Sequence, residues 1–145
     1  KESMNVAKSL AWNLTTDEIK EEWLQYFEKT KCQGLHIHCP EGSISKDGPS
    51  AGAAITTAIF SLLNKKKIKN DVAITGEITL SGNITAIGGL DIKLSYGIKN
   101  GVKTFLFPKE NHREFKIWFD KNNPSDELTF LEIENIKEIF KYVFL

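Results

Sequence analysis

The sequence contains little cysteine and no excess of either charge. Cys32 and Cys39 are the two cysteines among 145 residues, and 19 lysines and arginines balance 19 aspartates and glutamates. Two cysteines cannot form a disulfide framework in a domain of this length, so a reducing compartment is expected. Without net charge, the chain has no electrostatic attraction for nucleic acid or for a membrane surface, and neither partner is expected.

Long hydrophobic runs are also missing. No stretch approaches the roughly 18 to 20 apolar residues of a membrane-spanning helix, and the first ten residues, KESMNVAKSL, lack the apolar core of a signal peptide. This start is typical of a fragment excised from a longer chain. An apolar content of 41% and a charged content of 26% are typical of soluble globular proteins. No repeat or linker divides the chain, so residues 1–145 are predicted to form one domain.

Four potential zinc ligands lie close together in the window CQGLHIHC, namely Cys32, His36, His38 and Cys39. If LHIHC is a strand, the two histidines face one side of it and Cys39 faces the other. A tetrahedral site needs all four ligands to converge. No metal site is therefore predicted.

Helical and strand patterns alternate along most of the chain. Thr15 and Glu18 have the spacing of a capping box. Helices are predicted over residues 2–13, 17–30, from 50 onward, and over 90–100, 112–122 and 135–145. The helix from residue 50 onward has a predicted apolar stripe of Ala51, Ala54, Ile55, Ala58 and Leu62. Strands are predicted over residues 35–39, 71–80, 84–88, 103–108 and 128–133. This alternation predicts an α/β or α+β domain with a layered sheet and flanking helices.

Ser50 lies in the stretch KDGPSAG, between a proline and two small residues. The letters fit G-x-S-x-G, the nucleophile elbow of α/β-hydrolases. An elbow needs a strand that runs directly into the serine and a histidine late in the chain. Here a polar loop precedes Ser50, and the one later histidine, His112, begins a predicted helix. The elbow interpretation is rejected.

Histidine is one candidate base for Ser50. His36 or His38, together with Asp47, would complete a serine triad. The same two histidines are equally compatible with polar strand residues that line the edge of a cleft. Composition alone does not separate these alternatives.

Lysine is the other candidate base. Burial lowers the pKa of a lysine, and a neutral lysine can activate a serine. Lys93 fits this requirement best, because it shares the apolar face of a predicted helix with Leu90, Leu94 and Gly97. The alternative is a lysine whose stem packs on the apolar face while its amine reaches solvent.

Three longer segments resemble one known family. They are HIHCPEGSISKDGPSAG, TGEITLSGNITAIGGLDIKL and GVKTFLFPKEN, and they resemble the proteolytic domain of Lon, the ATP-dependent serine protease. The similarity covers essentially the whole chain. It implies the Lon proteolytic-domain fold, without the strands that precede the first helix in the family, and it implies that the chain is the C-terminal part of a longer protein.

The resemblance also implies roles for particular residues. By motif, Ser50 and Lys93 correspond to the family's Ser-Lys dyad, and Thr75 corresponds to the threonine that orients the lysine. Asp47 matches an acid beside the serine, and His38 belongs, with His36, to the family's H-x-H pair. The small residues after the serine leave room for a substrate chain.

An oxyanion site is expected at the start of the helix that follows Ser50. Pro49 fixes φ and stiffens the approach to the serine. The backbone N–H groups of Ser50 and Ala51, together with the helix dipole, suit the oxyanion of a tetrahedral intermediate.

The resemblance implies a serine endopeptidase that cleaves unfolded, damaged or regulatory proteins. The sequence has no GxxxxGK[ST] phosphate loop, so the ATPase module, with its ATP and Mg²⁺, is expected outside this segment. A homo-hexamer is expected for the full-length protein, in a bacterial cytoplasm or a mitochondrial matrix. The alternatives are an ATP-independent Lon-like peptidase and an inactive assembly or binding domain.

Overall fold

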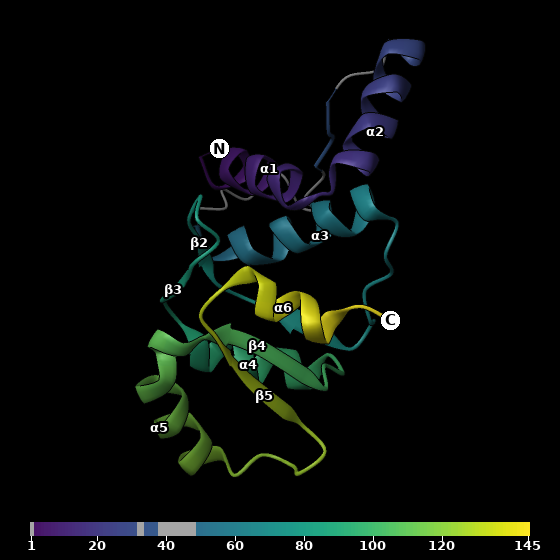
Figure 1. Ribbon diagram of the computed structural model, residues 1–145. Coiled ribbons are helices and arrows are strands. Elements are labelled where there is room, and N and C mark those ends of the chain that lie inside the picture. The colour runs from purple at the N-terminus through teal and green to yellow at the C-terminus, as the bar shows by residue number, and fades with distance from the viewer. Residues whose placement is uncertain (1, 32–33, 38–48) are drawn as a thin grey trace.

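The computed structural model describes residues 2–31, 34–37 and 49–145 and contains helices around two small sheets (Figure 1). In chain order the elements are α1 (Glu2–Leu14), α2 (Asp17–Thr30), the 3₁₀ turn η1 (Pro49–Ala51), α3 (Gly52–Asn64), β1 (Val72–Ile74), β2 (Glu77–Ile78), β3 (Ile84–Thr85), α4 (Leu90–Lys99), β4 (Thr104–Pro108), the 3₁₀ turn η2 (Lys109–Asn111), α5 (His112–Asn122), β5 (Thr129–Ile133) and α6 (Ile136–Val143). None of the helices in these ranges combines the length and apolarity needed to cross a bilayer.

A parallel sheet forms the middle layer, with strand order β1-β4-β5. Val72 pairs with Thr104, and Thr104 pairs in turn with Thr129, so the three strands start in register. The second sheet is the antiparallel pair β2-β3. A parallel sheet with helices on its faces confirms the predicted α/β class.

The central strand β4 contributes to a core on each face of the sheet. Phe105 and Phe107 pack with residues of α4 and α5, including Leu94 and Trp118. Leu106 points the other way and packs with residues of α1, α3 and α6. This alternation follows from the two-residue period of a strand. In Figure 1, α3 and α6 lie above β4, and α5 lies below it.

Most predicted elements are confirmed, but the helix caps and two strands differ. The N-cap of α2 is Thr16, which makes no side-chain cap. Thr15 is buried and donates its hydroxyl to the Ala11 carbonyl at 2.8 Å. The predicted Thr15–Glu18 capping box is therefore wrong. Of the strand predicted over 35–39, residues 35–37 are not in a strand, and the rest lies outside the described residues.

The strand predicted over residues 71–80 is two strands. It leaves the parallel sheet after β1 and forms β2 of the hairpin after two intervening residues. The turn predicted at Ser81–Asn83 connects β2 to β3, as expected. The split falls at Thr75 and Gly76, which the sequence placed in the middle of a strand.

The predicted stripe of α3 is also wrong. Leu62 is 55% exposed, and Ala51 and Ala58 are exposed as well. The buried face contains Thr56 and Thr57 instead. Their hydroxyls each donate to the carbonyl four residues earlier, at 2.8 Å, which satisfies both polar groups inside the core.

Gly97 allows α4 to pack closely on β4. A Cβ at this position would lie 2.5 Å from Cε1 of Phe105, and Phe105 is fixed by stacking on Phe130. Gly97→Ala should therefore destabilise the protein by about 1–3 kcal/mol, since overpacking forces neighbours out of place. Gly88→Ala is the matched control, because nothing lies within 4 Å of its Cβ position. Urea denaturation measures both, and equal stability of the two variants would contradict this packing.

Candidate active site

Ser50 lies in η1, directly before α3, and its backbone is bound by the two residues between β1 and β2. Its carbonyl accepts a hydrogen bond from the Gly76 N–H at 2.9 Å and another from the Thr75 hydroxyl at 3.3 Å. The Gly76 carbonyl in turn accepts from the Ala53 N–H at 3.0 Å. These three bonds connect the serine turn to the point where the chain leaves the sheet.

Small residues make this contact possible. A Cβ at Gly76 would lie 2.5 Å from Cγ2 of Ile84, and one at Gly52 would lie 2.7 Å from Cγ2 of Ile78. Real Cβ atoms essentially never come so close to another heavy atom. Glycine at position 52 therefore allows the start of α3 to pack against β2, and glycine at position 76 allows the chain before β2 to pack against β3.

Lys93 reaches Ser50 from α4. Its Nζ donates to the Ser50 Oγ at 2.9 Å. Leu90, Leu94 and Gly97 are buried on the same face of α4, which confirms the apolar face predicted from the sequence. Lys93 itself is half-buried. The structure thus brings together the serine and the lysine that the sequence singled out, 43 residues apart.

The surroundings of Lys93 favour its neutral form. Burial lowers the pKa of Lys93 from its ordinary value, and the nearby carboxylate of Glu114 raises that pKa in the opposite direction by a smaller amount. A cavity of about 280 Å³ lies beside the amine. Most of its lining is apolar; it comprises Ser50, Ala51, Ala54, Ala73, Ile74, Thr75, Leu90, Lys93, Leu94, Phe105, Leu106 and Phe107.

The remaining predicted residues are placed only in part. Ala51 is exposed and is the N-cap residue of α3. His36 is exposed, whereas His38 and Asp47 lie outside the described residues. So do Cys32 and Cys39, two of the four zinc ligands considered. Within the ranges that the structure describes, no group of three or more His, Cys, Asp or Glu side chains could hold a metal ion.

Sequence reasoning assigned no role to Glu110, Asn111 and Glu114, although all three contact the backbone that leads into α4. These residues lie 24 positions from their partners. The only signal for Glu110 and Asn111 was the segment GVKTFLFPKEN, which belongs to the resemblance but carries no visible chemistry, and Glu114 lies outside it.

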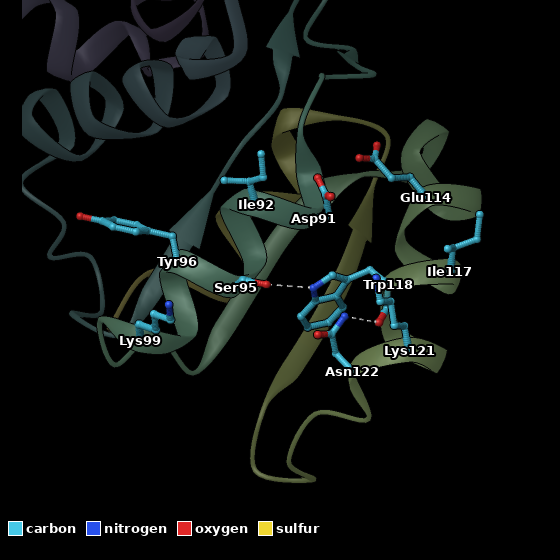
Figure 2. Close-up of a pocket in the computed structure, with 10 residues that line it drawn as sticks. All are labelled: Asp91, Ile92, Ser95, Tyr96, Lys99, Glu114, Ile117, Trp118, Lys121 and Asn122. Carbon is cyan, nitrogen blue, oxygen red and sulfur yellow. Dashed lines mark hydrogen bonds between the residues drawn. The ribbon is translucent and has the colours of Figure 1, made fainter.

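A larger groove of about 520 Å³ lies between α4 and α5 (Figure 2). It is lined by Asp91, Ile92, Ser95, Tyr96, Lys99, Glu114, Ile117, Trp118, Lys121 and Asn122. The Trp118 indole N–H donates to the Ser95 hydroxyl at 3.1 Å across its floor. The groove contains none of the site residues predicted from the sequence, so its size does not make it the reaction site.

Comparisons with known proteins point to one protein family. A family model described as the Lon protease (S16) C-terminal proteolytic domain matches residues 1–145. The Lon protease of Metamycoplasma arthritidis is 45% identical over 119 residues, which are 81% of this chain and 14% of that protein. The Lon protease of Buchnera aphidicola is 47% identical over 107 residues, which are 74% of this chain and 14% of that protein.

A third relative covers almost the whole chain. The Lon protease of Mesomycoplasma hyopneumoniae is 36% identical over 145 residues, which are 99% of this chain and 16% of that protein. The chain thus spans only 14 to 16% of the length of these three relatives. With the family model matched from end to end, the chain belongs to the Lon protease (S16) C-terminal proteolytic domain family.

Proposed function

We propose that this domain is a serine endopeptidase in which Ser50 is the nucleophile and Lys93 is the general base. The observation that carries the proposal is the 2.9 Å contact between Lys93 Nζ and Ser50 Oγ, in a chain of a protease family. A lowered lysine pKa supports it further, because only a neutral amine can accept the hydroxyl proton.

The reaction would begin with neutral Lys93. The Ser50 hydroxyl donates its proton to the amine as Oγ attacks the carbonyl carbon of the scissile peptide bond. The tetrahedral intermediate then collapses, and the lysine ammonium gives its proton to the leaving amine. Water hydrolyses the resulting ester, with Lys93 again accepting the proton. The Lys93 Nζ therefore accepts and returns the proton in each half of the reaction.

The backbone around Ser50 would stabilise the negative charge that develops on the substrate oxygen. The N–H groups of Ser50 and Ala51 are the proposed oxyanion donors, at the N-terminal end of α3 where the helix dipole favours an anion. The Thr75 hydroxyl holds the Ser50 carbonyl, which supports a fixed serine turn. Thr75 is proposed to orient the Lys93 amine as well, and Asp47 and His38 to support the site.

The substrates are proposed to be unfolded, damaged or regulatory proteins inside a cell, delivered by an ATPase module outside this segment. This chain has no GxxxxGK[ST] phosphate loop, so its residues do not fit ATP and no step above uses ATP or Mg²⁺. A homo-hexamer is proposed for the full-length protein. The three relatives named above are bacterial, which supports a bacterial cytoplasm over a mitochondrial matrix as the compartment.

Ser50→Ala should abolish peptide cleavage, with a loss on the order of 10⁴-fold or more, because it removes the nucleophilic oxygen. The fold should remain, since one small atom is lost at a loop–helix junction. The test is hydrolysis of a fluorogenic peptide by the full-length protein, alongside its melting temperature. Turnover within tenfold of wild type would exclude Ser50 as the nucleophile.

Lys93→Arg should be inactive although it keeps the positive charge, because a guanidinium does not give up its proton in proteins. Lys93→Ala should be inactive too, since it has no base. The same peptide assay compares both variants with wild type, and circular dichroism checks that they are folded. Substantial activity in Lys93→Arg would rule out lysine and turn attention to His36 and His38.

Activity should rise with pH as Lys93 loses its proton. The neutral fraction grows as the pH passes through the pKa of the folded protein, and burial places that pKa below the ordinary lysine value of 10.5. The rising limb of kcat/KM should therefore lie at lower pH than the titration of an exposed lysine. An activity that falls over this range would contradict a neutral lysine base.

A further inference from the structure

The backbone that leads into α4 is held by side chains of η2, the 3₁₀ turn directly before α5. The Glu110 carboxylate accepts from the Ala86 N–H at 2.9 Å. The Asn111 side chain accepts from the Ile87 N–H at 3.0 Å and donates to the Ile87 carbonyl at 2.8 Å. Asn111 is buried. A segment of irregular chain is thus bound to a rigid element at three points.

The next contact reaches α4 itself. The N-cap residue of α4 is Gly89, which has no side chain to cap the helix and adopts a left-handed φ of 70°. Glu114 replaces the missing cap from another helix, because its Oε1 accepts from the Leu90 N–H at 3.1 Å. In Figure 2, the Glu114 side chain extends from α5 toward the start of α4. A carboxylate is favoured there because the first N–H groups of a helix are unpaired within it.

Asn111 fixes the direction of this carboxylate. Its Nδ2 donates to the Glu114 Oε2 at 3.1 Å, while Glu114 Oε1 remains bound to α4. Both oxygens of Glu114 are therefore used. Lys93 follows within the first turn, and its backbone N–H donates to the Gly89 carbonyl at 3.2 Å. The Lys93 side chain therefore belongs to the first turn of α4, which Glu114 binds through the Leu90 N–H.

We propose that Glu114, oriented by Asn111, is a positioning residue that fixes the start of α4 and thereby holds the Lys93 amine against Ser50. This inference rests on the proposed function of Ser50 and Lys93. It goes beyond that function because it assigns a role in the same site to a residue of another helix.

The charge of Glu114 adds a second effect. Lys93 lines a cavity with the uncharged Ser50 of η1 and Thr75, which follows β1, and the charge of Glu114 on α5 acts on its amine. Among the described charged groups, Glu114 is the one whose field raises the pKa of Lys93, against the larger lowering by burial. Removing the carboxylate should lower that pKa further. Asp91, on α4 itself, lines the same groove as Glu114 (Figure 2) without this effect on Lys93.

Glu114→Gln tests both effects, and Asp91→Asn is its matched control. Each change removes one negative charge from the same groove near the start of α4. In Glu114→Gln, the plateau of kcat should fall about tenfold with little change in KM, because a slightly misplaced base slows the chemical step. The rising limb of its pH profile should move to lower pH. Asp91→Asn should change neither quantity.

The direct readout is the side-chain NMR titration of Lys93 in the full-length protein labelled with ¹³C,¹⁵N-lysine. The Lys93 signal is identified by its absence in Lys93→Arg. Its midpoint should move to lower pH in Glu114→Gln and stay in place in Asp91→Asn. Glu114→Asp keeps the carboxylate but is one methylene shorter, so it should restore the Lys93 midpoint more fully than the activity.

An unchanged kcat in Glu114→Gln, or a fall in kcat accompanied by a lower melting temperature, would overturn the positioning role of Glu114. An unchanged Lys93 midpoint in Glu114→Gln would overturn the charge effect. An equal shift in Asp91→Asn would overturn it as well. The titration needs no substrate, so its result does not depend on whether Ser50 is the nucleophile. An active Ser50→Ala variant would instead defeat the proposed function and leave the titration result standing.

Discussion

The central constraint of this structure is the contact of the Lys93 amine with the Ser50 hydroxyl beside a mostly apolar cavity. Lys93 Nζ and Ser50 Oγ are 2.9 Å apart, and burial lowers the pKa of the lysine. A solvated lysine would keep its proton near neutral pH and could not act as a base. The site therefore depends on an apolar setting for one residue that ordinarily stays in water. Most features of the surrounding fold can be understood as ways to hold these two groups together.

The fold meets this constraint by bringing three separate segments to one point. The serine turn η1 is fixed through the Ser50 carbonyl by Thr75 and Gly76. Helix α4 carries Lys93 and is pressed onto β4, where Gly97 removes the side chain that would collide with Phe105. The break between β1 and β2 supplies the third segment. At this break the Thr75 N–H still donates to the Leu106 carbonyl of β4, while the Thr75 hydroxyl and the Gly76 N–H bond to the serine turn.

The sequence predicted much of this arrangement because local patterns carried it. The period of α4 placed Lys93 with Leu90 and Leu94, and the motif resemblance selected the same lysine. Other features depend on tertiary contacts that no local pattern contains. Thr56 and Thr57 lie outside the predicted apolar stripe of α3, yet their hydroxyls bond to their own helix and both residues are buried. The alternation of residues 71–80 continues through a change of sheet that is set by close packing at Gly76. Glu114 caps a helix 24 residues away, a pairing that only the folded chain reveals.

The central claim is that Lys93 activates Ser50, and the reaction of the serine with a phosphonofluoridate tests it most directly. The measurement is the rate of covalent labelling as a function of pH, with the labelled residue located by mass spectrometry in wild type and in Lys93→Ala. We expect a single adduct on Ser50. Its rate of formation should rise as one group loses its proton, and the pKa of that group should lie below the ordinary pKa of lysine. Lys93→Ala should lose this labelling. Labelling of Ser50 at the same rate in Lys93→Ala, or an adduct on another residue, would contradict it.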